Sequence, residues 1–140
     1  MRFVLDNSVS MRWLFGDGSA ADQSYAAHVL GLMENEGATA LVPGLWALEV
    51  SNVILRSEAR GLLTEARSAE FLATLQDMTL EVDGETAARA RSDTLQLARR
   101  FKLSSYDAAY LELALRKGLA LASLDVDLRR AAAQAGLSMV

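Results

Sequence analysis

Short apolar segments of strand length alternate with longer helical segments along this 140-residue chain. The strand-like segments are RFVL (2–5), ATALVP (38–43), TLEV (79–82) and LALAS (119–123). Apolar residues at helical spacing predict one helix directly after residue 6 and others at 19–36, 45–60, 64–76, 85–100, 104–118 and 127–135. Such alternation is typical of a parallel sheet covered by helices on both faces. We therefore expect an α/β fold.

The composition agrees with one globular domain over residues 1–140. The chain is 51% hydrophobic and 23% charged, and its length suits a single core. No apolar run approaches the roughly 20 residues that a membrane span needs, and the N-terminal MRFVLD lacks the pattern of a signal peptide. Cysteine is absent, which excludes disulfides and thiolate metal sites. We expect a cytoplasmic protein with no membrane partner.

Two acidic residues follow the first and last predicted strands. Asp6 comes directly after 2–5, and Asp125 comes shortly after 119–123. In open α/β sheets, ligands bind beyond the carboxyl ends of the strands where the strand order reverses. If these two strands are neighbours, the two carboxylates meet at that place. The alternative for Asp6 is a purely structural role as a cap of the helix that follows.

A third acid, Glu49, borders the apolar stripe of the helix predicted at 45–60. Asn52 and Arg56 follow on nearly the same line of the helix surface. Two interpretations stay open for this line. It is either an exposed Glu–Arg edge or a polar stripe that faces a cleft.

A fourth acid, Asp107, stands in a capping-box pattern that begins at Ser104, which would make it a structural residue. However, Asp107 shares the apolar face of its helix with Tyr110. Glu112 and Arg116 pair at i,i+4 on the other side and are expected to be solvated. An ionised carboxylate on an apolar face costs several kcal/mol unless a charge or a metal ion meets it. Asp107 is therefore also a candidate ligand.

The acids taken together indicate a function more clearly than any one of them does alone. Asp125 and Asp127 are both candidates to cap the last helix, which leaves one of them without a structural role. Close carboxylates repel by on the order of 4 kcal/mol per pair at an effective dielectric near 20. A cluster of Asp6, Glu49, Asp107 and Asp125 therefore persists only if a divalent cation binds it. All-oxygen ligation favours Mg²⁺ or Mn²⁺.

Three segments resemble the PIN-domain ribonucleases, specifically the VapC-type toxins of bacterial type II toxin–antitoxin pairs. They are FVLDNSVSMRWLF (3–15), VPGLWALEVSNVIL (42–55) and LSSYDAAYLELALRKGLALASLDVDLRRAA (103–132). The segments stand in the family's order and at similar spacing, and the resemblance covers essentially the whole chain. It implies a three-layer α/β/α sandwich with a central parallel sheet.

The resemblance also implies where the family's acidic site falls. Its four catalytic acids correspond to Asp6, Glu49, Asp107 and Asp125, and Asp127 is an additional acid next to the metal. Asp6 and Asp125 would hold the principal Mg²⁺, for which Mn²⁺ would substitute, and Asp107 would bind it directly or through water. Glu49 would orient the attacking water or help to hold a second ion.

Three polar residues are expected to support these acids. Ser123 supplies the hydroxyl that often precedes the fourth acid, at a position where threonine is commoner in the family. Ser8 and Asn52 are the other two. Asn7 occupies a variable position after the first acid, and neither departure removes an acid from the site.

The activity that the resemblance implies is Mg²⁺-dependent endonucleolytic hydrolysis of RNA phosphodiester bonds. In the family, a cognate VapB-type antitoxin blocks the site and the toxins form homodimers. The net charge of −4 is opposite in sign to the basic excess usual in nucleic-acid-binding proteins, so RNA would need local cations. The candidates, each of which could instead be a solvated helix residue, are Arg12, Arg56, Arg99, Arg100 and Lys102. Trp13, Phe15 and Trp46 could contact a partner or belong to the core.

Other functions remain as alternatives. A PIN-like domain could bind RNA or protein without catalysis, although retention of all the acids argues against this. A receiver-type phosphoacceptor domain would carry paired acids after the first strand and a lysine after the last. Here the first strand is followed by LDNS, and no lysine stands beyond residue 117. A phosphatase with an aspartyl nucleophile would carry Asp-x-Asp after the first strand, whereas this chain has it only after the last.

Overall fold

The computed structural model describes all 140 residues, and a four-stranded parallel sheet forms its centre. The strands lie in the order β3 (Leu80–Val82), β2 (Thr39–Val42), β1 (Arg2–Leu5) and β4 (Ala120–Ala122). Within this sheet, Phe3 lies opposite Ala40 of β2 on one side and Ala120 of β4 on the other. Strands β1 and β4, after which the first and last acids follow, are therefore neighbours. The strand order also reverses between them.

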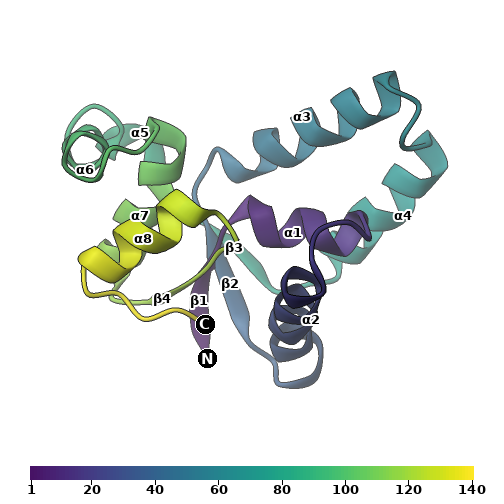
Figure 1. The fold of residues 1–140 in the computed structure, drawn as a ribbon, viewed down its shortest axis with the longest axis horizontal. Coiled ribbons are helices and arrows are strands. Elements are labelled where there is room, and N and C mark those ends of the chain that lie inside the picture. Colours follow the sequence, from purple (N-terminus) through teal and green to yellow (C-terminus); the bar gives the residue numbers. More distant parts are fainter.

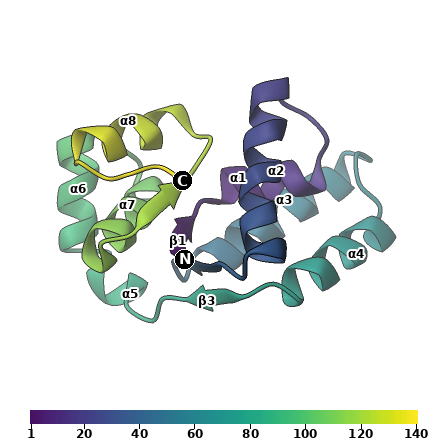
Figure 2. The same cartoon turned by 90° about the horizontal axis from the view of Figure 1, so that it is seen from below.

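Eight helices cover the sheet. They are α1 (Asn7–Leu14), α2 (Ala20–Asn35), α3 (Trp46–Ala59), α4 (Glu65–Gln76), α5 (Thr86–Arg89), α6 (Asp93–Phe101), α7 (Ser105–Lys117) and α8 (Val126–Gln134). Helices α1 to α4 lie on one side of the strands and α5 to α8 on the other, and the two chain ends lie close together (Figures 1 and 2). This confirms the expected three-layer α/β/α fold. None of the helices is both long enough and apolar enough to cross a membrane.

Strands β1 and β4 are buried on both faces. Phe3, Val4 and Leu5 of β1, and Leu121 and Ala122 of β4, have no solvent exposure. Continuous apolar strands of this kind are what a sheet covered on both faces requires. Helix α7 packs against both strands. The core therefore fixes the position of α7, the helix that carries Asp107.

The aromatic residues of the first half of the chain belong to the core. Trp46 is buried, and its indole N–H donates to Ser10 Oγ at 3.3 Å. The indole N–H of Trp13 donates to the carbonyl of Ala26 at 2.8 Å, and Phe15 packs against the same core. These contacts favour the core interpretation of the three aromatic residues over a docking role.

The helix predicted at 85–100 is wrong as a single element. It is divided into α5 and α6, because Ser92 adopts a non-helical backbone with φ −125° and ψ −99°. Serine favours helix starts, but the neighbouring residues are common within helices and conceal the break. All other predicted strands and helices from residue 19 onward agree with the structure to within one residue at each end.

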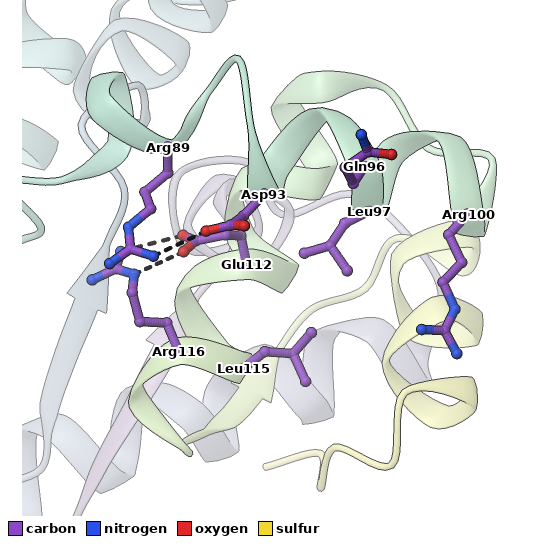
Figure 3. Close-up of a pocket in the computed structure, with 8 residues that line it drawn as sticks. All are labelled: Arg89, Asp93, Gln96, Leu97, Arg100, Glu112, Leu115 and Arg116. Atoms are coloured by element: carbon purple, nitrogen blue, oxygen red, sulfur yellow. Dashed lines mark hydrogen bonds and ion pairs between the residues drawn. The ribbon is translucent and has the colours of Figure 1, made fainter.

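The expectation that Glu112 and Arg116 are solvated is also wrong. Glu112 is only 5% exposed. Arg116 donates to Glu112 at 2.7 Å (Figure 3). It also donates to Asp83, in the loop after β3, at 2.7 Å. This hydrogen bond lowers the pKa of Asp83 below its ordinary value. The helix period predicted the Glu–Arg pair correctly, but a loop distant in sequence covers it.

Candidate active site

Asp6 lies where the carboxyl ends of β1 and β4 meet. Its amide N–H donates to the carbonyl of Ala122 at 2.9 Å, which continues the pairing of the two strands by one step. The hydroxyl of Ser123, which directly follows β4, donates to Asp6 Oδ2 at 2.8 Å. The sequence places these residues 117 positions apart, and the parallel sheet makes them neighbours.

The carboxylate of Asp6 is held by hydroxyl groups rather than by the helix that follows it. Asp6 is 5% exposed and makes no side-chain capping hydrogen bond to α1. Ser8 Oγ donates to Asp6 Oδ2 at 2.6 Å and accepts from the amide of Leu124 at 2.9 Å. Burial raises the pKa of Asp6, the bonds from Ser8 and Ser123 lower it, and the charge of Asp125 raises it again. Ser8 and Ser123 thus both contact the carboxylate of Asp6.

Asp125 is the residue that caps the last helix. Its Oδ1 accepts from the amide of Leu128 at 2.8 Å, and its other carboxylate oxygen accepts no hydrogen bond from the protein. Asp127 is exposed and forms an ion pair with Arg130 at 3.0 Å. The cap therefore belongs to the first of the two acids. Asp127 lies at the surface, and its charge has only a small effect on the pKa of Asp107.

Asp107 completes only half of the predicted capping box. Its amide donates to Ser104 Oγ at 3.1 Å, but no reciprocal bond joins its carboxylate to the amide of Ser104. The half-buried carboxylate is thus free. Burial, followed by the charges of Asp125 and Asp6, raises the pKa of Asp107 to about 6. This carboxylate lies near the other acids, and no cation compensates its charge.

Glu49 reaches the same group of acids from α3. Burial raises its pKa, and the charges of Asp6 and Asp107 act in the same direction. The hydroxyl of Tyr110 donates to Glu49 Oε1. Glu49 has no other side-chain partner, so this one hydrogen bond holds its carboxylate. The polar-stripe interpretation of Glu49 is the one that the structure favours.

Tyr110 is the residue that the sequence interpretation assigned only to the apolar face of its helix. It has no solvent exposure and lies almost one helical turn after Asp107, on the same side of α7. A tyrosine at a fully buried position needs a partner for its hydroxyl. The spacing from Asp107 was the available signal, but it did not indicate that the partner was on α3.

The basic residues expected to guide RNA form no ion pair with the four acids, and one of them lies beside Asp125. Arg12 lines a hollow of about 530 Å³ together with Ser8 and Asp125, and it forms an ion pair with Asp17 at 2.7 Å. The remaining candidates, like Asn52, are exposed: Arg56, Arg99, Arg100 and Lys102. No basic side chain forms an ion pair with Asp6, Glu49, Asp107 or Asp125. Arg12 is thus the candidate that lies beside the site.

The donor set fits a hard divalent cation, although the side chains do not form a finished metal site. No three acidic or histidine side chains lie close enough together to hold an ion. However, all the donors are carboxylate or hydroxyl oxygens, the ligand type of Mg²⁺ and Mn²⁺. The pKa values of Asp6, Glu49 and Asp107 are each raised in part by neighbouring carboxylates. A divalent cation would relieve that repulsion, and the carboxylates would move closer together to bind it.

The role of Tyr110 can be measured through the carboxylate that it contacts. Tyr110→Phe removes the donor that lowers the pKa of Glu49, so this pKa is expected to rise in the variant. An NMR titration of the glutamate carboxyl carbons measures the change. Tyr106→Phe is the matched control because the Tyr106 side chain is 65% exposed. An unchanged Glu49 pKa in Tyr110→Phe would show that the hydrogen bond does not govern this carboxylate.

The raised pKa of Asp107 makes the stability of the metal-free protein depend on pH. The folded-state value of about 6 lies above the ordinary 3.8, so ionisation of Asp107 destabilises the fold as pH rises between these values. Asp107→Asn removes this cost and is expected to stabilise the protein by about 1–2 kcal/mol more at pH 8 than at pH 4, after allowance for partial exposure. Urea unfolding in EDTA at both pH values measures this. Asp77→Asn, which changes an exposed residue, is the control and should have the same effect at both pH values. An equal gain at both pH values for Asp107→Asn would contradict the prediction.

Comparisons with known proteins agree with this architecture. The family model described as "PIN domain" matches residues 3–134. Among solved structures, PAE2754 from Pyrobaculum aerophilum has a TM-score of 0.65 and 19% identity, covering 94% of this chain and 84% of that one. VapBC2 from Rickettsia felis, bound to a DNA fragment from their promoter, has a TM-score of 0.66 and 13% identity, covering 100% and 98%. These two likenesses concern the fold. No curated protein matches the sequence.

Proposed function

Because this chain belongs to the PIN-domain family, we propose that it is a Mg²⁺-dependent endoribonuclease that hydrolyses RNA phosphodiester bonds. One observation carries the proposal: four carboxylates gather at the carboxyl edge of the sheet, and none has a cationic partner. Such an arrangement is costly for folding and suits the binding of a divalent cation. The likeness to PIN-domain ribonucleases points to RNA as the substrate.

The acidic residues would have different roles in the reaction. Asp6, Asp107 and Asp125 would hold the cation, and Asp127 would add negative charge from the surface. When bound, Mg²⁺ would lower the pKa of a water molecule and neutralise charge that develops on the phosphate oxygens. Glu49, held by Tyr110, would orient the attacking water. Phosphoryl transfer depends on such positioning and charge stabilisation, so the reaction needs no protein nucleophile.

The hydroxyl groups give Asp6 a fixed position. Ser8 and Ser123 donate to the same carboxylate oxygen, and Ser8 is itself fixed by the amide of Leu124. The other oxygen of Asp6 accepts no side-chain hydrogen bond and would be the one to bind the cation. A ligand whose orientation is set by such secondary contacts needs less reorganisation when the ion binds.

The biological role follows from the same resemblance. We propose that the protein acts in the cytoplasm as the toxin of a VapBC-type pair, as a homodimer whose activity a VapB-type antitoxin blocks. Its fold is similar to that of the VapBC2 structure from Rickettsia felis. A neighbouring small open reading frame that encodes a DNA-binding protein would support this role, and co-purification of its product with this chain would test it.

Cleavage of RNA in the presence and absence of Mg²⁺ tests the proposed activity. The purified protein should produce defined RNA fragments with Mg²⁺ or Mn²⁺ and none in EDTA. Sequencing of the fragment ends would give the preferred site. RNA binding without any cleavage under all of these conditions would favour the alternative of a non-catalytic PIN-like module.

A further inference from the structure

An uncharged hollow lies at the same edge of the sheet as the acids. Its volume is about 380 Å³, and its lining includes Leu45, Ala90, Ala109 and Tyr106. Leu45 directly precedes α3, the helix of Glu49, and the other side chains come from α7 and the turn after α5. None of the residues that line the hollow carries a charge. It therefore offers no cationic side chain to a phosphate group.

Tyr106 is unusual among the aromatic residues of this chain. Its side chain is 65% exposed, whereas Tyr110 on the same helix has no exposure at all. It lines the hollow, and the next residue is Asp107. The remaining wall contains mostly small side chains, which leave room beside the aromatic ring. An exposed ring of this kind provides a flat apolar surface next to the acids.

Single-stranded RNA offers phosphates and bases in strict alternation. Tyr106 and Asp107 lie in the same first turn of α7, so a nucleotide whose phosphate binds at the acids would have a flanking base within reach of the Tyr106 ring. Bases stack on aromatic side chains, and this contact tolerates different base identities. The acids and their cation suit the phosphate, and the uncharged hollow suits the base.

We propose that Tyr106 and this hollow hold one nucleobase of the RNA, in a nucleotide that flanks the scissile phosphate. The inference rests on the proposed ribonuclease function and adds a base-binding subsite to it. An apolar side chain of a protein partner is the competing occupant. A hollow that holds such a protein side chain would not contribute to RNA cleavage. The experiment below therefore distinguishes a base from a protein side chain.

The experiment combines variants of Tyr106 with RNA substrates that lack a single base. Once the cleavage site in RNA is known, short oligonucleotides are made with an abasic residue at each position flanking that site. Cleavage with Mg²⁺ is then measured for the wild type, Tyr106→Ala, Tyr106→Trp and Leu72→Ala. Leu72 is an exposed residue of α4 that lies outside the acids and the hollow, and it serves as the control for loss of apolar surface. Melting temperatures verify that each variant is folded.

The expected result is a loss that depends on the base. Tyr106→Ala should lower kcat/KM roughly 5- to 100-fold, mainly through KM, and Tyr106→Trp should retain activity because it keeps a stacking surface. One abasic position should impair the wild type by a similar factor and have no further effect on Tyr106→Ala. Leu72→Ala should behave as the wild type.

Three results would count against the subsite. If Tyr106→Ala cleaves RNA as well as the wild type does, the hollow does not hold a base, and a protein occupant becomes the better explanation. If Tyr106→Ala impairs intact and abasic RNA equally at every position, the residue acts on something other than a base. Both results leave the ribonuclease function standing. If the wild type does not cleave RNA at all, the proposed function itself fails and the subsite fails with it.

Discussion

Asp6→Asn is expected to reduce Mg²⁺-dependent RNA cleavage by on the order of 1,000-fold or more, because it removes a charged ligand worth several kcal/mol in the transition state. The fold should not suffer. Asp6 is buried and makes no capping bond, and asparagine still offers an oxygen to Ser8 and Ser123. Since burial raises the pKa of Asp6, the neutral side chain should leave the metal-free protein as stable as the wild type or more stable.

Cleavage rates and melting temperatures of the same preparation test this prediction together. Asp77→Asn is the matched control, because it removes an exposed carboxylate at the end of α4. It should leave both quantities almost unchanged. If Asp6→Asn retained cleavage, the acid would not be a ligand, and if its melting temperature fell sharply, Asp6 would have a mainly structural role.

Arg116→Met is expected to destabilise the protein by about 3–5 kcal/mol, the usual cost of leaving a buried charge without its partner. The Arg116 guanidinium is the only cationic partner of the buried Glu112, and it also binds Asp83 and Glu85 in the loop after β3. With total stabilities of roughly 5–15 kcal/mol, this is a large fraction, and the melting temperature should fall by roughly 10 °C or more.

A neighbouring arginine supplies the control. Arg89 pairs with Glu85 and Asp93 at the surface, beside Arg116 (Figure 3). Arg89→Met should cost only about 1 kcal/mol or less, because exposed ion pairs contribute little. Adding Glu112→Leu to Arg116→Met should restore part of the lost stability, because the buried Glu112 charge is then removed while Asp83 still lacks its partner. Equal losses in the two arginine variants would show that burial of Arg116 has no energetic importance.

The fold could be predicted well from the sequence because its signals are local. Each strand is a short apolar run, and most helices have a capping residue or a glycine at an end; Gly118, for example, ends α7 in the left-handed conformation. The break at Ser92 was missed because its causes are not local. Helix α6 packs against α7, and the residue pattern of 85–100 does not encode this contact.

The site residues that could be predicted from the sequence are those that follow a strand. Asp6 and Asp125 follow strands, and the topology of a parallel sheet then brings them to one edge. The bond between Tyr110 and Glu49 and the covering of Glu112 by Asp83 join elements far apart in the sequence. No periodic pattern encodes such contacts, because they depend on how α3, α7 and the loop after β3 pack in three dimensions.

Binding of Mg²⁺ to the acids should stabilise the folded protein, and Asp125 allows a matched comparison. Asparagine caps helices as well as aspartate does, so Asp125→Asn keeps the bond to Leu128 and removes only the charge. Melting temperatures are measured for both proteins with EDTA and with millimolar Mg²⁺. We expect a rise of several degrees for the wild type and a much smaller one for Asp125→Asn. Equal shifts in the two proteins would contradict a metal site at these carboxylates.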